Sequence, residues 1–264
     1  MNWGDYSPQR YWRHAGSVAI LFALVGLAAW RCEVSAGDLL RGIGKGLALL
    51  GFFFPPDWQS FPNMVEPAVV TVVVALIATP IGAAFSIVFG LAAARNISPP
   101  WLRTTTRTMI ALERGLPEIV ILLILVAAFG MGPFAGVIAL AIGSIGMLGK
   151  LVGDAIEEID ARTVESVACV GATRGQVIRY AVLPQILPSL LANSMFRFEV
   201  NIRASVLLGA VGAGGIGYEL STAMSQLEYN KATVAAFVSL VLVFVSERCS
   251  DFLRSKILDG GQLR

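Results

Sequence analysis

The chain has 264 residues, of which 56% are apolar and only 14% are charged, and its mean hydropathy is +0.72. Soluble chains carry roughly 25% charged residues, so this composition leaves too few polar side chains to cover a globule and excludes the soluble class. The formal net charge of +2 is too small for the basic footprint of a nucleic-acid-binding protein. The sequence therefore indicates an all-α integral membrane protein that binds no nucleic acid.

Six segments are predicted to cross the bilayer as helices. The clearest is 67–94, which is 28 residues long and carries no charge. The first, 14–31, has no small-residue cleavage site after it and is flanked by Trp12 and Trp30, so we expect an uncleaved helix rather than a signal peptide. The predicted spans cover residues 14–31, 67–94, 108–129, 133–151, 187–209 and 230–248.

The segment 31–66 is mixed in composition and contains a weakly amphipathic stretch that ends at Pro55 and Pro56. This pattern predicts a helix that lies in the membrane interface, followed by a loop.

The third and fifth predicted spans carry charge. Only 11 uncharged residues precede the turn at Gly130–Pro133, so the third span has to include Glu113, Arg114 and Glu118. The fifth includes Arg197, Glu199 and Arg203. Charges in lipid cost at least a few kcal/mol each, so these side chains are expected to face protein, water or one another.

Two interpretations of these arginines remain open. Glu199 with Arg203, and Arg114 with Glu118, are four residues apart and could form pairs on one helix face. Alternatively, Arg114 and Arg197 could line a pathway, because a guanidinium group can hold two oxygens of an oxyanion.

The distribution of basic residues predicts the orientation. With the N-terminus inside, the cytoplasmic segments hold thirteen lysines and arginines and the external segments hold four. Positive loops stay cytoplasmic, so both termini and the loop 153–185 are expected inside the cell, and the segment 31–66 in the periplasm.

The loop 153–185 contains two short helical patterns separated by Gly171, which fits a helix stop. Composition alone does not distinguish a docking element from an ordinary amphipathic loop.

The spacing within this loop resembles that of a known family. Glu165, then Gly171 six residues later, then Leu183-Pro184, is similar to the EAA loop of ABC-importer permeases, although Ser166 and Val167 replace two alanines and Ala181 replaces an isoleucine. The resemblance implies that this loop couples the permease to an ATPase subunit. The implied coupling residues are Glu165, Ser166, Gly171, Ala172, Arg174, Leu183 and Pro184.

Five further motifs, in the same order along the chain, resemble the permease of phosphonate importers. They are Arg114–Glu118, Gly130–Gly136, Gly146–Lys150, Phe196–Arg203 and Gly212–Gly217. The resemblance implies one MetI-like permease domain over 1–264 that imports phosphonates, phosphite or hypophosphite. It also implies two ATPase subunits that hold ATP and Mg, a periplasmic phosphonate-binding protein, and a second permease chain, most simply an identical copy.

The string Gly212-x-Gly214-x-x-Gly217 fits a dinucleotide fingerprint, but it follows an apolar helix rather than a strand. We expect instead a break where backbones approach closely, or an outer gate. The residues predicted to line the pathway or its gates are Arg114, Pro117, Glu118, Lys150, Arg197, Glu199, Arg203, Gly212, Gly214 and Gly215.

Resident chemistry is not expected on this chain. Three scattered cysteines and one histidine form no metal or catalytic cluster, and the sequence contains no P-loop string. We therefore expect a transport subunit with no metal and no cofactor of its own. The alternatives are an ABC permease for another small anion or an amino acid, an ion-driven secondary transporter that uses Glu113, Glu118 or Glu199, and an intramembrane enzyme acting on lipid phosphate.

Overall fold

The computed structural model describes residues 8–33 and 35–262, and within these ranges the regular elements are helices. The chain divides into two units, Met1–Phe54 and Pro55–Arg264. The single permease domain predicted over 1–264 stays a prediction.

The first unit contains α1 (Pro8–Arg31), α2 (Ala36–Leu50) and the short η1 (Gly51–Phe53). The apolar part of α1, Gly16–Arg31, is a helix, as predicted for the first span. Ser35 caps α2, because its hydroxyl oxygen accepts a hydrogen bond from the backbone N–H of Asp38 at 3.4 Å. Exposed Leu40, Ile43 and Leu47 share one face of α2, as an interfacial helix requires.

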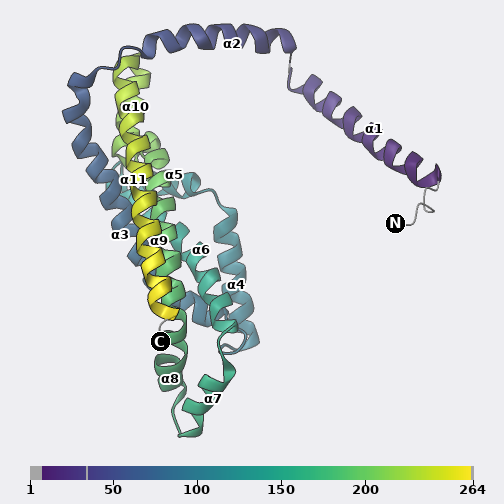
Figure 1. The fold of residues 1–264 in the computed structure, drawn as a ribbon, viewed down its shortest axis with the longest axis vertical. Coiled ribbons are helices and arrows are strands. Elements are labelled where there is room, and N and C mark those ends of the chain that lie inside the picture. The colour runs from purple at the N-terminus through teal and green to yellow at the C-terminus, as the bar shows by residue number, and fades with distance from the viewer. Residues whose placement is uncertain (1–7, 34, 263–264) are drawn as a thin grey trace. The chain divides into compact units, whose positions relative to one another are not determined.

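The second unit is a helical bundle with two short helices at one end. Its elements are η2 (Trp58–Ser60), α3 (Phe61–Ala93), α4 (Pro100–Gly115), α5 (Glu118–Phe129), α6 (Pro133–Glu157), α7 (Ala161–Cys169), α8 (Arg174–Val177), η3 (Ile178–Val182), α9 (Leu183–Leu208), η4 (Gly209–Ala213), α10 (Ile216–Ser225) and α11 (Tyr229–Gln262). Figure 1 shows α3, α6, α9 and α11 running along one another, with α7 and α8 beyond one end of the bundle and α10 toward the other.

Three of the predicted spans are confirmed as single helices. Among the described residues, α3, α6 and α11 are long and apolar enough to cross a membrane, and they match the predicted spans 67–94, 133–151 and 230–248. The span 187–209 lies in α9, which continues through η4 and then bends by 53° into α10. The total of six spans remains a prediction.

The predicted span 108–129 is wrong as a single helix. The chain leaves the helical conformation at Leu116, with φ −90° and ψ 125°, and α5 begins only after Pro117. Proline has no N–H, and its ring disfavours the helical conformation of the preceding residue. Arg114 and Glu118 therefore lie on different helices, which excludes the interpretation that they pair on one helix face.

The most extensive packing in the bundle is between α3 and α6, and it depends on glycine. A Cβ atom added at Gly82 would overlap the side chain of Ser144, and one added at Gly90 would overlap Val152. Because lipid tails are as apolar as leucine, helices in membranes associate through such close contacts between small residues. The other helices of the bundle, including α4 and α9, pack against this α3–α6 pair.

A leucine at Gly82 should separate these helices. We expect Gly82→Leu to lower the free energy of unfolding by about 1–3 kcal/mol, since overpacking forces the backbone to shift. The measurement is unfolding in mixed detergent micelles, followed by circular dichroism. Ala84→Leu, on the exposed side of α3, is the control and should change stability by less than about 0.5 kcal/mol; equal stability of the two variants would contradict the packing argument.

Candidate functional site

An ion pair between a buried arginine and a partly exposed glutamate joins the start of α5 to α9. Arg197 on α9 is only 5% exposed, and its Nη2 donates a hydrogen bond to Oε1 of Glu118 at 2.5 Å. Glu118 is the first residue of α5, so the break at Pro117 places its carboxylate against α9. Three residues predicted for the pathway, Pro117, Glu118 and Arg197, thus lie together. A charge taken out of water requires such a partner.

Polar side chains from α3 and α6 extend this ion pair. Arg197 Nε donates to the hydroxyl of Ser144 at 2.9 Å. The amide of Asn201, which is fully buried, donates to Ser144 at 3.0 Å and to the hydroxyl of Thr79 at 2.9 Å. We call these five residues, Glu118, Arg197, Ser144, Asn201 and Thr79, the buried polar network.

Sequence reasoning missed Thr79, Ser144 and Asn201 as site residues. Their partners within the network are 53 to 122 residues away along the chain, and no local spacing reveals such contacts. The available signal was that Asn201 lies four residues after Arg197, one helical turn further along the same face.

Two glycines of α6 make room for the charged groups. A Cβ atom at Gly143 would lie 2.6 Å from Oε1 of Glu118 and 2.9 Å from Nη2 of Arg197. One at Gly146 would overlap the carboxylate of Glu113, whose Oε2 is buried with no hydrogen-bond partner in the described part of the chain. The face of α6 that carries Gly143 and Gly146 therefore contacts Glu118 and Glu113, the acidic residues on either side of the helix break at Pro117.

The predicted local pairing of Arg203 with Glu199 is confirmed. The two residues are one turn apart on α9 and form an ion pair, with Glu199 buried and Arg203 reaching toward the surface. The charge of Arg203 is therefore balanced within its own helix.

The glycine-rich segment after α9 is a break in the helix, as predicted. Gly212, Gly214 and Gly215 have φ values of +114°, +78° and +74°, which side chains other than glycine rarely adopt. The carbonyl of Gly212 accepts a hydrogen bond from the backbone N–H of Gly132 at 2.8 Å. A helix, rather than a strand, leads into this segment, so the dinucleotide interpretation is excluded. Its role as a gate remains a prediction.

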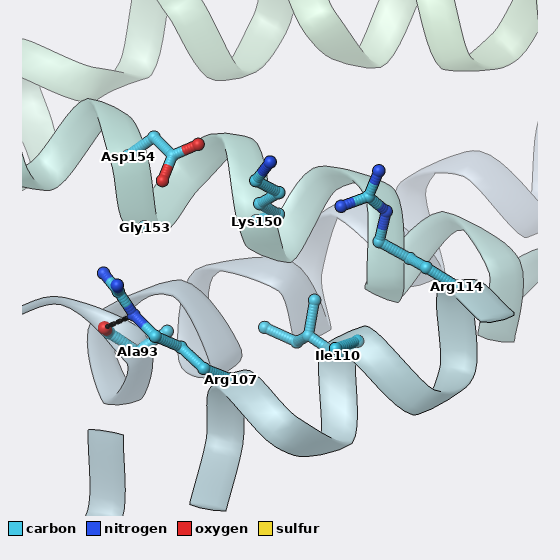
Figure 2. A pocket seen from close by; sticks show the side chains of 8 residues that line it. Ala93, Arg107, Ile110, Arg114, Lys150, Gly153 and Asp154 are labelled. Atoms are coloured by element: carbon cyan, nitrogen blue, oxygen red, sulfur yellow. Dashed lines mark hydrogen bonds between the residues drawn. The ribbon is translucent and has the colours of Figure 1, made fainter. Parts of the chain in front are cut away.

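Basic side chains also surround a cavity between α4 and α6. Its volume is about 290 Å³, and Arg107, Arg114, Lys150 and Asp154 supply its charged groups. Figure 2 shows Arg107 and Arg114 on one helix and Lys150 and Asp154 on the other. Two further residues predicted for the pathway, Arg114 and Lys150, thus lie together at a place separate from the buried polar network.

The loop between α6 and α9 forms the predicted helix, turn and helix. Asp160 caps α7 by accepting a hydrogen bond from the backbone N–H of Arg162 at 3.0 Å. Gly171 has φ +82°, which permits the reversal between α7 and α8. Thr173 and Gln176 form a capping box at the start of α8.

The coupling residues implied by the resemblance fall into two groups. Glu165, Ser166, Gly171 and Arg174 are exposed, and Ala172 is partly exposed. Leu183, in contrast, packs against a buried cluster that includes Val152 and Ile186, and Pro184 stands in the first turn of α9. The first group is available to a partner, whereas the second joins the loop to the bundle.

Known proteins resemble this chain over most of its length. It is 37% identical over 246 residues to the phosphite transport system permease protein PtxC of Stutzerimonas stutzeri, covering 92% of this chain and 90% of that protein. It is 42% identical over 250 residues to the phosphate-import permease protein PhnE of Mycolicibacterium smegmatis, covering 90% of this chain and 46% of that longer protein.

A solved structure shares the fold. A chain of the MetNI methionine ABC transporter, in an inward-facing conformation, superposes with a TM-score of 0.64 at 22% identity, covering 76% of this chain and 99% of the other. The predicted all-α, MetI-like membrane architecture is thereby confirmed.

Residues 86–259 match the family described as the binding-protein-dependent transport system inner membrane component, a match that covers the site residues above except Thr79. The chain is a multi-pass membrane protein and belongs to this family of importer permeases.

Proposed function

We propose that the chain is the transmembrane permease subunit of an ATP-driven importer that carries phosphorus oxyanions: phosphonates, phosphite or hypophosphite. The cargo is inferred from the sequence identity of 37–42% to proteins named for phosphite and phosphate transport. Relatives named for D-methionine transport reach only 26–30%, over about half of the chain. An amino acid is therefore the second candidate cargo.

The proposed assembly contains two permeases, two ATPase subunits and a periplasmic binding protein. The sequence has no P-loop, so ATP and Mg would be held by the ATPase subunits. A second, identical permease chain would complete the pathway, because one bundle of helices covers only one side of a pore. Both termini and the loop 153–185 would then lie in the cytoplasm, following the distribution of basic residues.

The coupling loop is well placed to act on the buried polar network. The loop connects the end of α6 to the start of α9, and these helices carry Ser144 and Arg197. A movement of α7 and α8 by the ATPase would therefore change the distance between α6 and α9, two of the helices that the network joins. Opening and closing of this network is the conformational step that we assign to alternating access.

The ion pair also suits an anionic cargo. When the pair opens, Arg197 loses the carboxylate of Glu118 and can hold the oxygens of a phosphorus oxyanion in its place. Competition with Glu118 keeps this contact weak, as a conduit requires for release.

The cargo can be tested with the reconstituted complex. We expect ATP-dependent uptake of phosphite or methylphosphonate into proteoliposomes that contain the permease, its ATPase and the loaded binding protein. Uptake of D-methionine with no uptake of either phosphorus compound would contradict the proposed cargo.

Removing the buried charges should separate folding from transport. Arg197→Gln leaves the partly exposed Glu118 unpaired, and we expect it to lower stability by about 1–3 kcal/mol and to reduce uptake. The double variant Arg197→Gln/Glu118→Gln leaves no unpaired charge, so stability should recover while uptake stays low.

Uptake and thermal unfolding of the purified complex measure these two effects. Arg254→Gln is the matched control, because Arg254 forms an exposed pair with Asp251 on α11. Full recovery of uptake in the double variant would show that the pair has only a structural role.

The turn at Gly171 should be required for coupling. Gly171→Pro cannot adopt the positive φ, so we expect ATP turnover to continue while uptake is lost. Gly171→Asn should retain most uptake, since asparagine tolerates this conformation. Glu165→Lys should uncouple in the same way, whereas Glu247→Lys, on the exposed side of α11, should not. Equal uptake by Gly171→Pro and Gly171→Asn would refute the role of the turn.

A further inference from the structure

The cavity between α4 and α6 has more positive than negative charge. Arg107 is already engaged: its Nε donates to the carbonyl of Ala93 at 2.9 Å, and its Nη2 pairs with Glu157. Glu157 also pairs with Arg95 at 2.9 Å, so one carboxylate serves two arginines.

Arg114 and Lys150 have no such partner. Across the described residues, neither side chain forms an ion pair or a hydrogen bond, although Asp154 lies one turn after Lys150 on the same helix. Of the residues that line the cavity, Arg107, Arg114 and Lys150 are basic and Asp154 is acidic. The lining therefore has an excess of two positive charges. Glu113, which precedes Arg114 on α4 and interacts with it electrostatically, packs against Gly146 and does not line the cavity.

The cavity is the right size for a small anion. Its volume of about 290 Å³ leaves room for a phosphorus oxyanion and several waters. Ile110 and Gly153 contribute apolar and bare surface between the charged groups, as Figure 2 shows. Arg114 and Lys150 are both exposed, so water reaches the cavity, and each side chain can offer an oxyanion a charge-assisted hydrogen bond.

The position of the cavity relates it to the buried polar network. Gly143, which contacts Arg197 and Glu118, and Lys150 are seven residues apart, so they lie on one face of α6 about 10 Å apart along its axis. From Lys150, α6 continues through Asp154 toward the coupling loop. The cavity therefore lies between the buried ion pair and the end of the bundle that carries α7 and α8.

We infer that Arg114 and Lys150 form a second anion site, which receives a phosphorus oxyanion from the Arg197 site before release toward the coupling-loop end. The site takes a free tetrahedral oxyanion with up to two negative charges, which matches the excess of two positive charges among the residues that line the cavity. This inference rests on the proposed function, because it assigns a further site to the same cargo.

Lysine protection tests the site directly in the assembled importer. The sequence contains four lysines, and Lys150 and Lys256 are both exposed. In phosphatidylcholine proteoliposomes, saturating inorganic phosphate or methylphosphonate should slow acylation of Lys150 by about tenfold, read by mass spectrometry, because a charge-assisted contact blocks the amine. Acylation of Lys256 should not change.

Variants identify the partner of Lys150. Arg114→Gln should abolish the protection of Lys150 and lower uptake by about tenfold, since it removes the guanidinium contact. Arg103→Gln is the matched control, because Arg103 is on the same helix but does not line the cavity; it should retain both protection and uptake.

The outcomes separate the possible occupants and the two proposals. Protection in phosphatidylglycerol vesicles without added phosphate, together with none by phosphate in phosphatidylcholine, would assign the cavity to a lipid headgroup and overturn the inference. Normal uptake of phosphite by the wild type with unprotected Lys150, and with Arg114→Gln equal to Arg103→Gln, would also overturn it while leaving the proposed function intact. Absence of uptake of any phosphorus oxyanion by the wild type, with Lys150 still protected, would instead contradict the proposed function.

Discussion

The burial of Arg197 sets the conditions that the rest of this bundle has to meet. A guanidinium group that is 5% exposed within an apolar bundle requires several kcal/mol of compensation, and here Glu118, Ser144 and Met147 provide its contacts. The contact with Glu118 depends on two local features of the backbone. The break before Pro117 brings Glu118 to α9, and Gly143 leaves the space that the ion pair occupies. The break before Pro117 and the absence of a side chain at Gly143 would weaken an ordinary membrane-spanning helix. In this bundle they allow the guanidinium group of Arg197 to be buried.

The sequence predicts those features of the fold that depend on local chemistry. Composition identifies a membrane protein, uncharged length identifies α3, α6 and α11, and the glycine at position 171 places the reversal between α7 and α8. The pairing of Glu199 with Arg203 is also predictable, because both residues lie on one helix.

The same reasoning fails where local signals conflict or where partners are distant. Bilayer thickness favours one long helix over 108–129, but the conformation required before Pro117 prevails, and so Glu118 pairs with Arg197 rather than with Arg114. The contacts of Asn201 with Thr79 and Ser144 join three helices, and their choice depends on how α3, α6 and α9 pack. A single sequence contains no record of that packing.

The two clusters of basic residues differ in one respect that bears on how an anion could pass. Arg197 already has an internal counter-ion in Glu118, so an incoming anion has to compete with a carboxylate for it. Arg114 and Lys150 have no such competitor, and Asp154 is the acidic side chain that shares their cavity. When Glu118 pairs with Arg197 again, it would displace a dianion bound there. The dianion would then meet the unpaired Arg114 and Lys150 about two helical turns further along α6. The Arg197 site is buried but its arginine is paired, and the Arg114–Lys150 site has unpaired cations but is exposed. Neither site would therefore bind the anion tightly, and weak binding is what a transport pathway requires for release.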